Sequence, residues 1–83
     1  MKLPRDVSGE RLARALKVLG YRVTRQTGSH MRLTRAAAVG RVEHHVTIPR
    51  HDPLRLGTLA SILDDVAAHF EINRDELIAK IFD

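Results

Sequence analysis

Apolar residues recur with helical spacing in two stretches of this chain. Near its start, Leu12, Leu16 and Leu19 share one face of a helix predicted over residues 9–19. In the second half, the spacing i, i+3, i+4, i+7, i+8 and i+11 is typical of an amphipathic helix with a wide apolar face. This longer stripe consists of Leu59, Ile62, Leu63, Val66, Ala67 and Phe70. It predicts the helix that covers the sheet.

The starts and ends of these helices carry capping residues. Ser8 is a good N-cap for the first helix, and Val7 and Leu12 stand where a hydrophobic staple packs across such a cap. Gly20 follows this helix at the place where a left-handed residue commonly ends one. Thr58 is expected to be the N-cap of the second helix.

Between the two helices, alternation of apolar and polar residues predicts three strands. They span residues 21–25, 30–34 and 42–48. Because successive side chains of a strand point to opposite faces, one set in each strand should face the core. These inward residues are expected to be Tyr21 and Val23, Met31 and Leu33, and Val42, His44, Val46 and Ile48.

His30 begins the second predicted strand, directly after a turn that contains Gly28. Its parity places it on the outward face of the sheet. If the second and third strands form an antiparallel hairpin with matched faces, the paired residue numbers must add to an odd value. Plausible loop lengths then put His30 opposite His45 or Thr47, so His45 is the second histidine expected near it.

The third strand should end at Pro49, since proline cannot donate a hydrogen bond to a strand ladder. Pro49 and Pro53 bound a constrained loop in which Arg50, His51 and Arg55 concentrate positive charge. A last short helix should begin at a capping box. The box is formed by Asn73 and Glu76, and Leu77, Ile78 and Ile81 should dock the helix.

The predicted order is helix, three strands, helix and short helix, with no internal repeat or linker. It indicates a single α+β domain over residues 1–83, with helices on one face of an antiparallel sheet and the other face open to a ligand. The chain has no cysteine, so neither a disulfide nor a thiolate metal site braces it. No apolar run is long enough for a membrane span, and a cytoplasmic location is expected.

Charge is divided unevenly along the chain. Residues 1–57 contain 12 Lys and Arg against 4 Asp and Glu, whereas residues 58–83 contain 2 against 6. A basic first part suggests a polyanionic partner such as nucleic acid, although a solvated basic surface would have the same composition.

Several short motifs occur in order along nearly the whole chain. They are Ser8-Gly9, Leu19-Gly20-Tyr21, Arg25-Gln26-Thr27-Gly28-Ser29-His30, Val46-Thr47-Ile48-Pro49-Arg50-His51, and Gly57-Thr58-Leu59 with Ile62-Leu63. Together they resemble the HicA family of bacterial toxins, small ribonucleases that cleave messenger RNA and are held inactive by a HicB antitoxin. The resemblance implies a fold like the double-stranded-RNA-binding domain, and it assigns the catalytic histidine to His30.

The residues themselves supply what metal-independent RNA cleavage needs. The 2′-OH of RNA is an internal nucleophile, so a histidine for proton transfer and cations for the phosphorane suffice, with no cofactor. His30 is the candidate general acid/base, and His45 and His51 are auxiliary candidates. The expected RNA-binding residues are Arg22, Arg25, Ser29, Arg32 and Arg50. A HicB-like antitoxin, acidic where it binds, is expected to cover the same outward face.

Two other interpretations remain open at the level of sequence. One is a non-catalytic RNA-binding module, an inactive homologue of the toxin. The other is a metal site made by His44, His45 and His51, which is weakened because adjacent strand residues point to opposite faces. The parity of His44 makes it a core residue, and His69 beside Phe70 is expected to have a surface or packing role.

Overall fold

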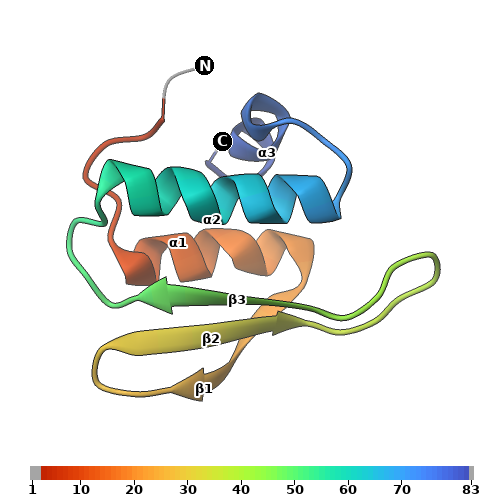
Figure 1. Cartoon of the computed structure of the whole chain (residues 1–83), viewed down its shortest axis with the longest axis horizontal. Helices are drawn as coiled ribbons and strands as arrows, with labels where there is room; N and C mark the ends of the chain where they lie inside the picture. The colour runs from red at the N-terminus through yellow and green to blue at the C-terminus, as the bar shows by residue number, and fades with distance from the viewer. Residues whose placement is uncertain (1–2, 83) are drawn as a thin grey trace.

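The computed structural model describes residues 3–82, in which three antiparallel strands form one open sheet (Figure 1). In chain order the elements are α1 (Gly9–Leu16), the 3₁₀-helix η1 (Lys17–Leu19), β1 (Tyr21–Gln26), β2 (His30–Arg35), β3 (His44–Pro49), α2 (Leu56–His69) and α3 (Arg74–Phe82). This order confirms the predicted α+β class, and it is consistent with a fold like the double-stranded-RNA-binding domain. None of the helices described here is both long enough and apolar enough to span a membrane.

The strands are arranged in the order β1-β2-β3, so β1 and β3 are the two edges of the sheet. Figure 1 shows α1 and α2 on the same side of the sheet, with the opposite side bare. Aliphatic side chains from the helices and from the inner face of the sheet form one continuous core. Its fully buried members include Leu12, Leu16, Tyr21, Leu33, Ile48, Leu59, Leu63 and Leu77.

The predicted caps of the first helix are present. The Ser8 hydroxyl accepts a hydrogen bond of 3.0 Å from the backbone N–H of Arg11, and Gly20 ends η1 with a φ of 91°. Val7 is buried beside the helix start, as the staple requires. The continuous α-helix expected over residues 9–19 is nevertheless wrong in its last turn, which tightens into η1.

Val23 does not reach the core as predicted, because 39% of its surface is exposed. It pairs with the buried Leu33, but it stands on the edge strand, where no further strand covers it. Directly after Val23 the register shifts, so that Arg25 and not Thr24 is the partner of Arg32. This is a β-bulge, which adds one residue to β1 and changes the face of everything that follows.

The third strand begins at His44, two residues later than predicted, and Val42 is 75% exposed. The connection before it forms an isolated bridge between Ala38 and Arg41. Figure 1 shows this hairpin projecting beyond the helices, so nothing covers its apolar side chains. Further along β3, Val46 and Ile48 are buried as expected.

The predicted cap of α2 is also wrong. The helix begins at Leu56, and Arg55 occupies the N-cap position without a side-chain hydrogen bond to the helix. Thr58 therefore lies in the first turn rather than before it. The apolar stripe of this helix is buried as predicted, and the Asn73–Glu76 capping box opens α3 with reciprocal bonds of 2.8 and 3.2 Å.

His44 points inward, as its parity predicts, but it is only half-buried and joins a polar group at the edge of the core. Its Nδ1 lies 2.6 Å from the hydroxyl of Tyr21, and its Nε2 lies 3.2 Å from a carboxylate oxygen of Asp65. Burial raises the pKa of Tyr21 to about 12, so the phenol keeps its proton. The ring of His69 stacks on His44 at 4.3 Å, which confirms a packing role.

α1 comes close to the end of β3 at Gly9, and this contact leads to a prediction about stability. A Cβ at residue 9 would overlap the carbonyl oxygen of Pro49, whereas a Cβ at Gly57 would meet nothing within 4 Å. We expect Gly9→Ala to lower the free energy of unfolding by about 1–3 kcal/mol, the usual cost of overpacking. Gly57→Ala, also in the first turn of a helix, should be neutral or stabilising by up to about 1 kcal/mol. Urea denaturation of both variants checks this, and equal effects would contradict it.

Candidate functional site

His30 begins β2 at the end of the sheet where β3 finishes. It pairs with Pro49, so the prediction that it lies opposite His45 or Thr47 is wrong. Paired residue numbers do add to an odd value, and His30, Arg32 and Thr34 share the outward face as predicted. The error lies in the expected length of the connection between β2 and β3. The residue opposite His30 is therefore two positions beyond Thr47 and four beyond His45.

A tight turn fixes the backbone of His30. The Thr27 N–H donates to the carbonyl of His30 at 2.9 Å, and the N–H of His30 donates to the Thr27 hydroxyl at 3.1 Å. The same hydroxyl lies 3.4 Å from the N–H of Ser29. Thr27 therefore orders the turn with its side chain, a role that threonine takes in local turns.

The imidazole of His30 is held from one side by its neighbour. Ser29 Oγ lies 2.8 Å from His30 Nδ1, so one ring nitrogen is engaged. None of the described residues bonds Nε2, and the side chain is exposed. A ring whose one nitrogen is oriented by a protein group and whose other nitrogen faces solvent can exchange a proton with a bound molecule.

Arg50 connects this turn to the rest of the fold. Its backbone N–H donates to the carbonyl of Ser29 at 2.8 Å, which continues the pairing of β2 and β3 by one bond. Its guanidinium donates to the carbonyl of Thr27 at 3.4 Å and forms an ion pair of 3.0 Å with Glu10 on α1. The side chain of Arg50 thus links the turn to α1, and the predicted contact of this residue with RNA stays a prediction.

Next to His30 the surface is hollowed between β3 and the first turns of α2. This depression of about 470 Å³ is lined by His30, Thr47, Pro49, Gly57, Thr58, Ser61 and Ile62. The hydroxyls of Thr58 and Ser61 thus share a hollow with the imidazole, which the sequence did not predict. The Gly57-Thr58 motif carries a signal for this hollow, but its sequence pattern predicts only a helix cap at Thr58.

The outward face of the sheet brings several of the predicted arginines together. Arg25 on β1 pairs with Arg32 on β2. Arg22 pairs with Thr34, which follows Arg32 on the same face of β2. Strict alternation from Tyr21 would have turned Arg25 inward. The bulge after Val23 instead puts it beside Arg32, so two guanidinium groups stand on the strand that carries His30 and on its neighbour.

The other histidines are not brought to this site. His45 pairs with Thr34, four residues along β2 from His30, or about 13 Å away at the usual rise of a strand. It bonds Thr34 and Glu43 instead, at 2.8 and 2.9 Å. His51 lines a separate hollow with Asp52. Among residues 3–82, no three histidine or carboxylate side chains are grouped so that they could hold a metal ion.

These features define a small α+β protein with an exposed, oriented histidine on a basic sheet face. The family model described as the HicA toxin of bacterial toxin-antitoxin matches residues 9–67. The chain therefore belongs to the HicA toxin family, and this membership implies an antitoxin partner. Searches of curated proteins and of solved structures found no significant match.

The Arg50 tether generates a test of how the turn is held. We expect Arg50→Ala to speed amide hydrogen exchange in residues 27–30, because the turn loses its side-chain link to α1. The free energy of unfolding should fall by no more than about 1 kcal/mol, as is usual for an ion pair at the surface. Arg74→Ala, which breaks the exposed pair with Asp64, is the matched control and should leave exchange in the turn unchanged. Unchanged exchange in both variants would show that the turn is held without the Arg50 side chain, by its backbone bonds and the Thr27 hydroxyl.

Proposed function

We propose that this toxin is an endoribonuclease that cleaves messenger RNA, with His30 as its general acid/base. The observation that carries the proposal is the free Nε2 of an imidazole that Ser29 orients on the arginine-bearing face, next to a hollow between β3 and α2. Membership of a toxin family supports the biological role, and the geometry supports the chemistry.

The reaction follows from the structure of RNA. The 2′-OH attacks the adjacent phosphorus and loses its proton to a base, while the bond from phosphorus to the 5′-oxygen breaks and that oxygen takes up a proton. The products are a 2′,3′-cyclic phosphate and a free 5′-OH. His30 performs one of these proton transfers through Nε2. DNA lacks the 2′-OH and should not be cleaved by this route.

The negative charge that develops on the phosphorane needs donors and cations around it. Arg25 and Arg32, which pair on adjacent strands, supply positive charge on the face that bears His30. The hydroxyls of Thr58 and Ser61 line the same hollow as the imidazole and can donate to phosphate oxygens. Ser29 orients the histidine through Nδ1, and where its oxygen accepts from Nδ1–H its own O–H can still donate to RNA.

The first functional prediction concerns His30. We expect His30→Ala to reduce RNA cleavage about 10²- to 10⁴-fold, the usual contribution of a general acid/base. Its free energy of unfolding should change by no more than about 0.5 kcal/mol, since the side chain is exposed. His45→Ala is the matched control: it removes a histidine from the same face, away from the hollow, and should retain cleavage near the wild-type rate. Gel assays on a defined RNA and growth after induction provide the readouts.

The outcomes separate the proposal from its alternative. Cleavage retained by a folded His30→Ala protein would overturn the assignment of the catalytic residue. A wild-type protein that binds RNA but never cleaves it would identify the non-catalytic module, an inactive homologue of the toxin.

A second prediction concerns the ends of the product. We expect cleavage to survive EDTA and to leave a 2′,3′-cyclic phosphate or its hydrolysis product, because the attacking group is supplied by the RNA. Mass spectrometry of the fragments identifies these ends. Activity that disappears with EDTA and returns with a divalent ion, or a product with a 5′-phosphate, would contradict this route.

A further inference from the structure

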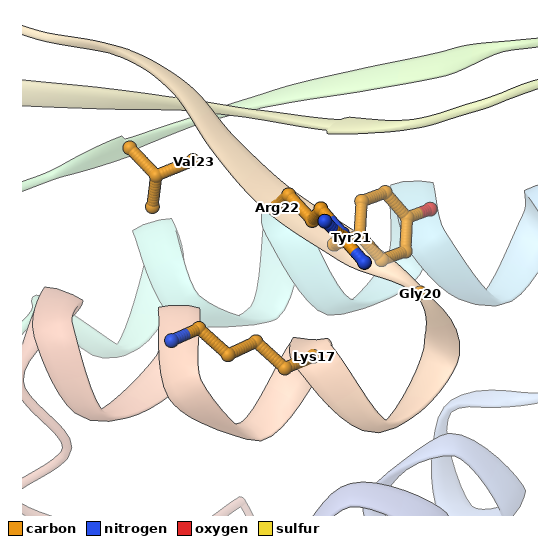
Figure 2. A pocket seen from close by; sticks show the side chains of 5 residues that line it. All are labelled: Lys17, Gly20, Tyr21, Arg22 and Val23. Carbon is orange, nitrogen blue, oxygen red and sulfur yellow. The ribbon is translucent and has the colours of Figure 1, made fainter.

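A groove runs between α1 and the outer edge of β1, on the side of the sheet that the helices cover. Its deeper part has a volume of about 510 Å³ and is lined by Lys17, Gly20, Tyr21, Arg22 and Val23. Figure 2 shows Lys17, the first residue of η1, extending beneath β1, with the side chain of Val23 directed toward the helix. A second hollow of about 220 Å³ shares Lys17 and Val23 with the first and continues it toward Arg50.

The walls of this groove carry positive charge without partners. Arg14, Lys17 and Arg22 form no ion pair or hydrogen bond through their side chains with any described residue. The one carboxylate in the lining, Glu10, is already paired with Arg50. Unpaired cations that line a concave surface attract a negatively charged partner.

The floor and the rim of the groove fit a polypeptide better than a nucleic acid. Val23 contributes exposed apolar surface, and Ala13 and Met31 line the same hollow. The rim is the outer edge of β1, which has no neighbouring strand in the described residues. An extended peptide can satisfy the backbone groups of such an edge, whereas a nucleotide chain has no matching ladder.

A second copy of this chain is not the fitting occupant. β1 carries two arginines, Arg22 and Arg25, so two such strands placed edge to edge would repel each other. Charge complementarity selects a strand that bears carboxylates.

We propose that this groove receives an extended acidic segment of the antitoxin, which pairs with β1 as a fourth strand of the sheet. The proposal rests on the toxin function proposed above and specifies how the partner binds. Alternate side chains of the segment would face the groove: carboxylates would meet Arg14 and Lys17, and apolar side chains would cover Val23. The groove adjoins the His30 face through Arg22, which pairs with Thr34 on that face, so one partner can reach both.

Hydrogen exchange tests the strand pairing without any variant. The toxin is co-expressed with the antitoxin encoded beside it, and exchange is compared between the complex and the free full-length toxin. We expect the amides of β1 that do not bond to β2 to become protected at least tenfold in the complex. A stable complex in which those amides exchange as in the free toxin would overturn the proposal. Failure to form any complex, or absence of toxicity, would instead count against the toxin function.

A charge reversal in the groove tests whether its positive charge attracts the antitoxin. Lys17→Glu should slow association of the antitoxin about tenfold at low salt, with less effect at high salt, since exposed charges are screened over roughly 10 Å at 0.1 M ionic strength. Lys80→Glu on α3 makes the same change in net charge outside the groove and is the control. Equal association rates for the two variants would overturn the groove as the binding surface. Circular dichroism confirms that both are folded.

A measurement with RNA tests whether the groove binds nucleic acid instead of the antitoxin. The same exchange measurement is made with a short RNA that is 2′-O-methylated at each position, so that no free 2′-OH can attack the phosphorus. We expect this oligonucleotide to leave the outer amides of β1 unprotected. If it protects them as the antitoxin does, the groove binds nucleic acid and the peptide assignment is wrong.

Discussion

The junction of residues 49–51 with the turn before β2 is the constraint on which the candidate site depends. Pro49 pairs with His30, and the N–H of Arg50 bonds the carbonyl of Ser29. The carbonyl of His51 accepts a bond of 2.9 Å from the N–H of Gly9, which starts α1. One short segment therefore fixes the end of β3, the turn that presents the imidazole and the first residue of the helix beneath it.

The two faces of the sheet follow from the same alternation but have different chemistry. The inner face is apolar over Met31, Leu33, Val46 and Ile48, and at one end it carries the paired residues Arg35 and His44. The half-buried imidazole of His44 bonds Tyr21 and Asp65, and the guanidinium of Arg35 donates to the carbonyl of Leu19, so both polar groups keep hydrogen bonds. The outer face collects the polar residues of all three strands and lies under no helix. A basic surface that is bare on a rigid sheet can bind a polyanion with little rearrangement.

Local sequence rules predicted what depends on neighbouring residues. Alternation placed Met31 and Leu33 inside and His30 outside, and capping rules located Ser8 and Gly20. Each of these outcomes is set within a few residues, where propensity and patterning act directly. The same rules failed where the outcome depends on a distant contact. The pairing of His30 with Pro49 depends on the length of the β2–β3 connection, and its one turn residue, Gly40 with a φ of 78°, does not by itself fix that length.

The predictions of strict alternation in β1 and of the start of α2 failed for a related reason. One extra residue in a strand leaves no compositional mark, so the face of Arg25 could not be derived from its position. Thr58 has the side chain of an N-cap, but α2 begins two residues earlier and leaves its hydroxyl in the hollow beside His30. Side chains that the sequence classed as structural are thus available to the candidate site.

The groove beside β1 lies next to the candidate site, so the protein could bind an inhibitor through contacts that a substrate does not make. As the proposed substrate, RNA would offer phosphates and bases to the outer face, and its attraction to arginines would be weakened by salt. A protein segment that also pairs with the edge of β1 gains backbone hydrogen bonds that salt does not screen. Because Arg22 lies on β1 between the groove and the outer face, a partner anchored along the strand would stand close to the approach to His30. Specific inhibition then requires no mimicry of RNA, since affinity from the strand edge and exclusion at the site come from adjacent parts of one surface.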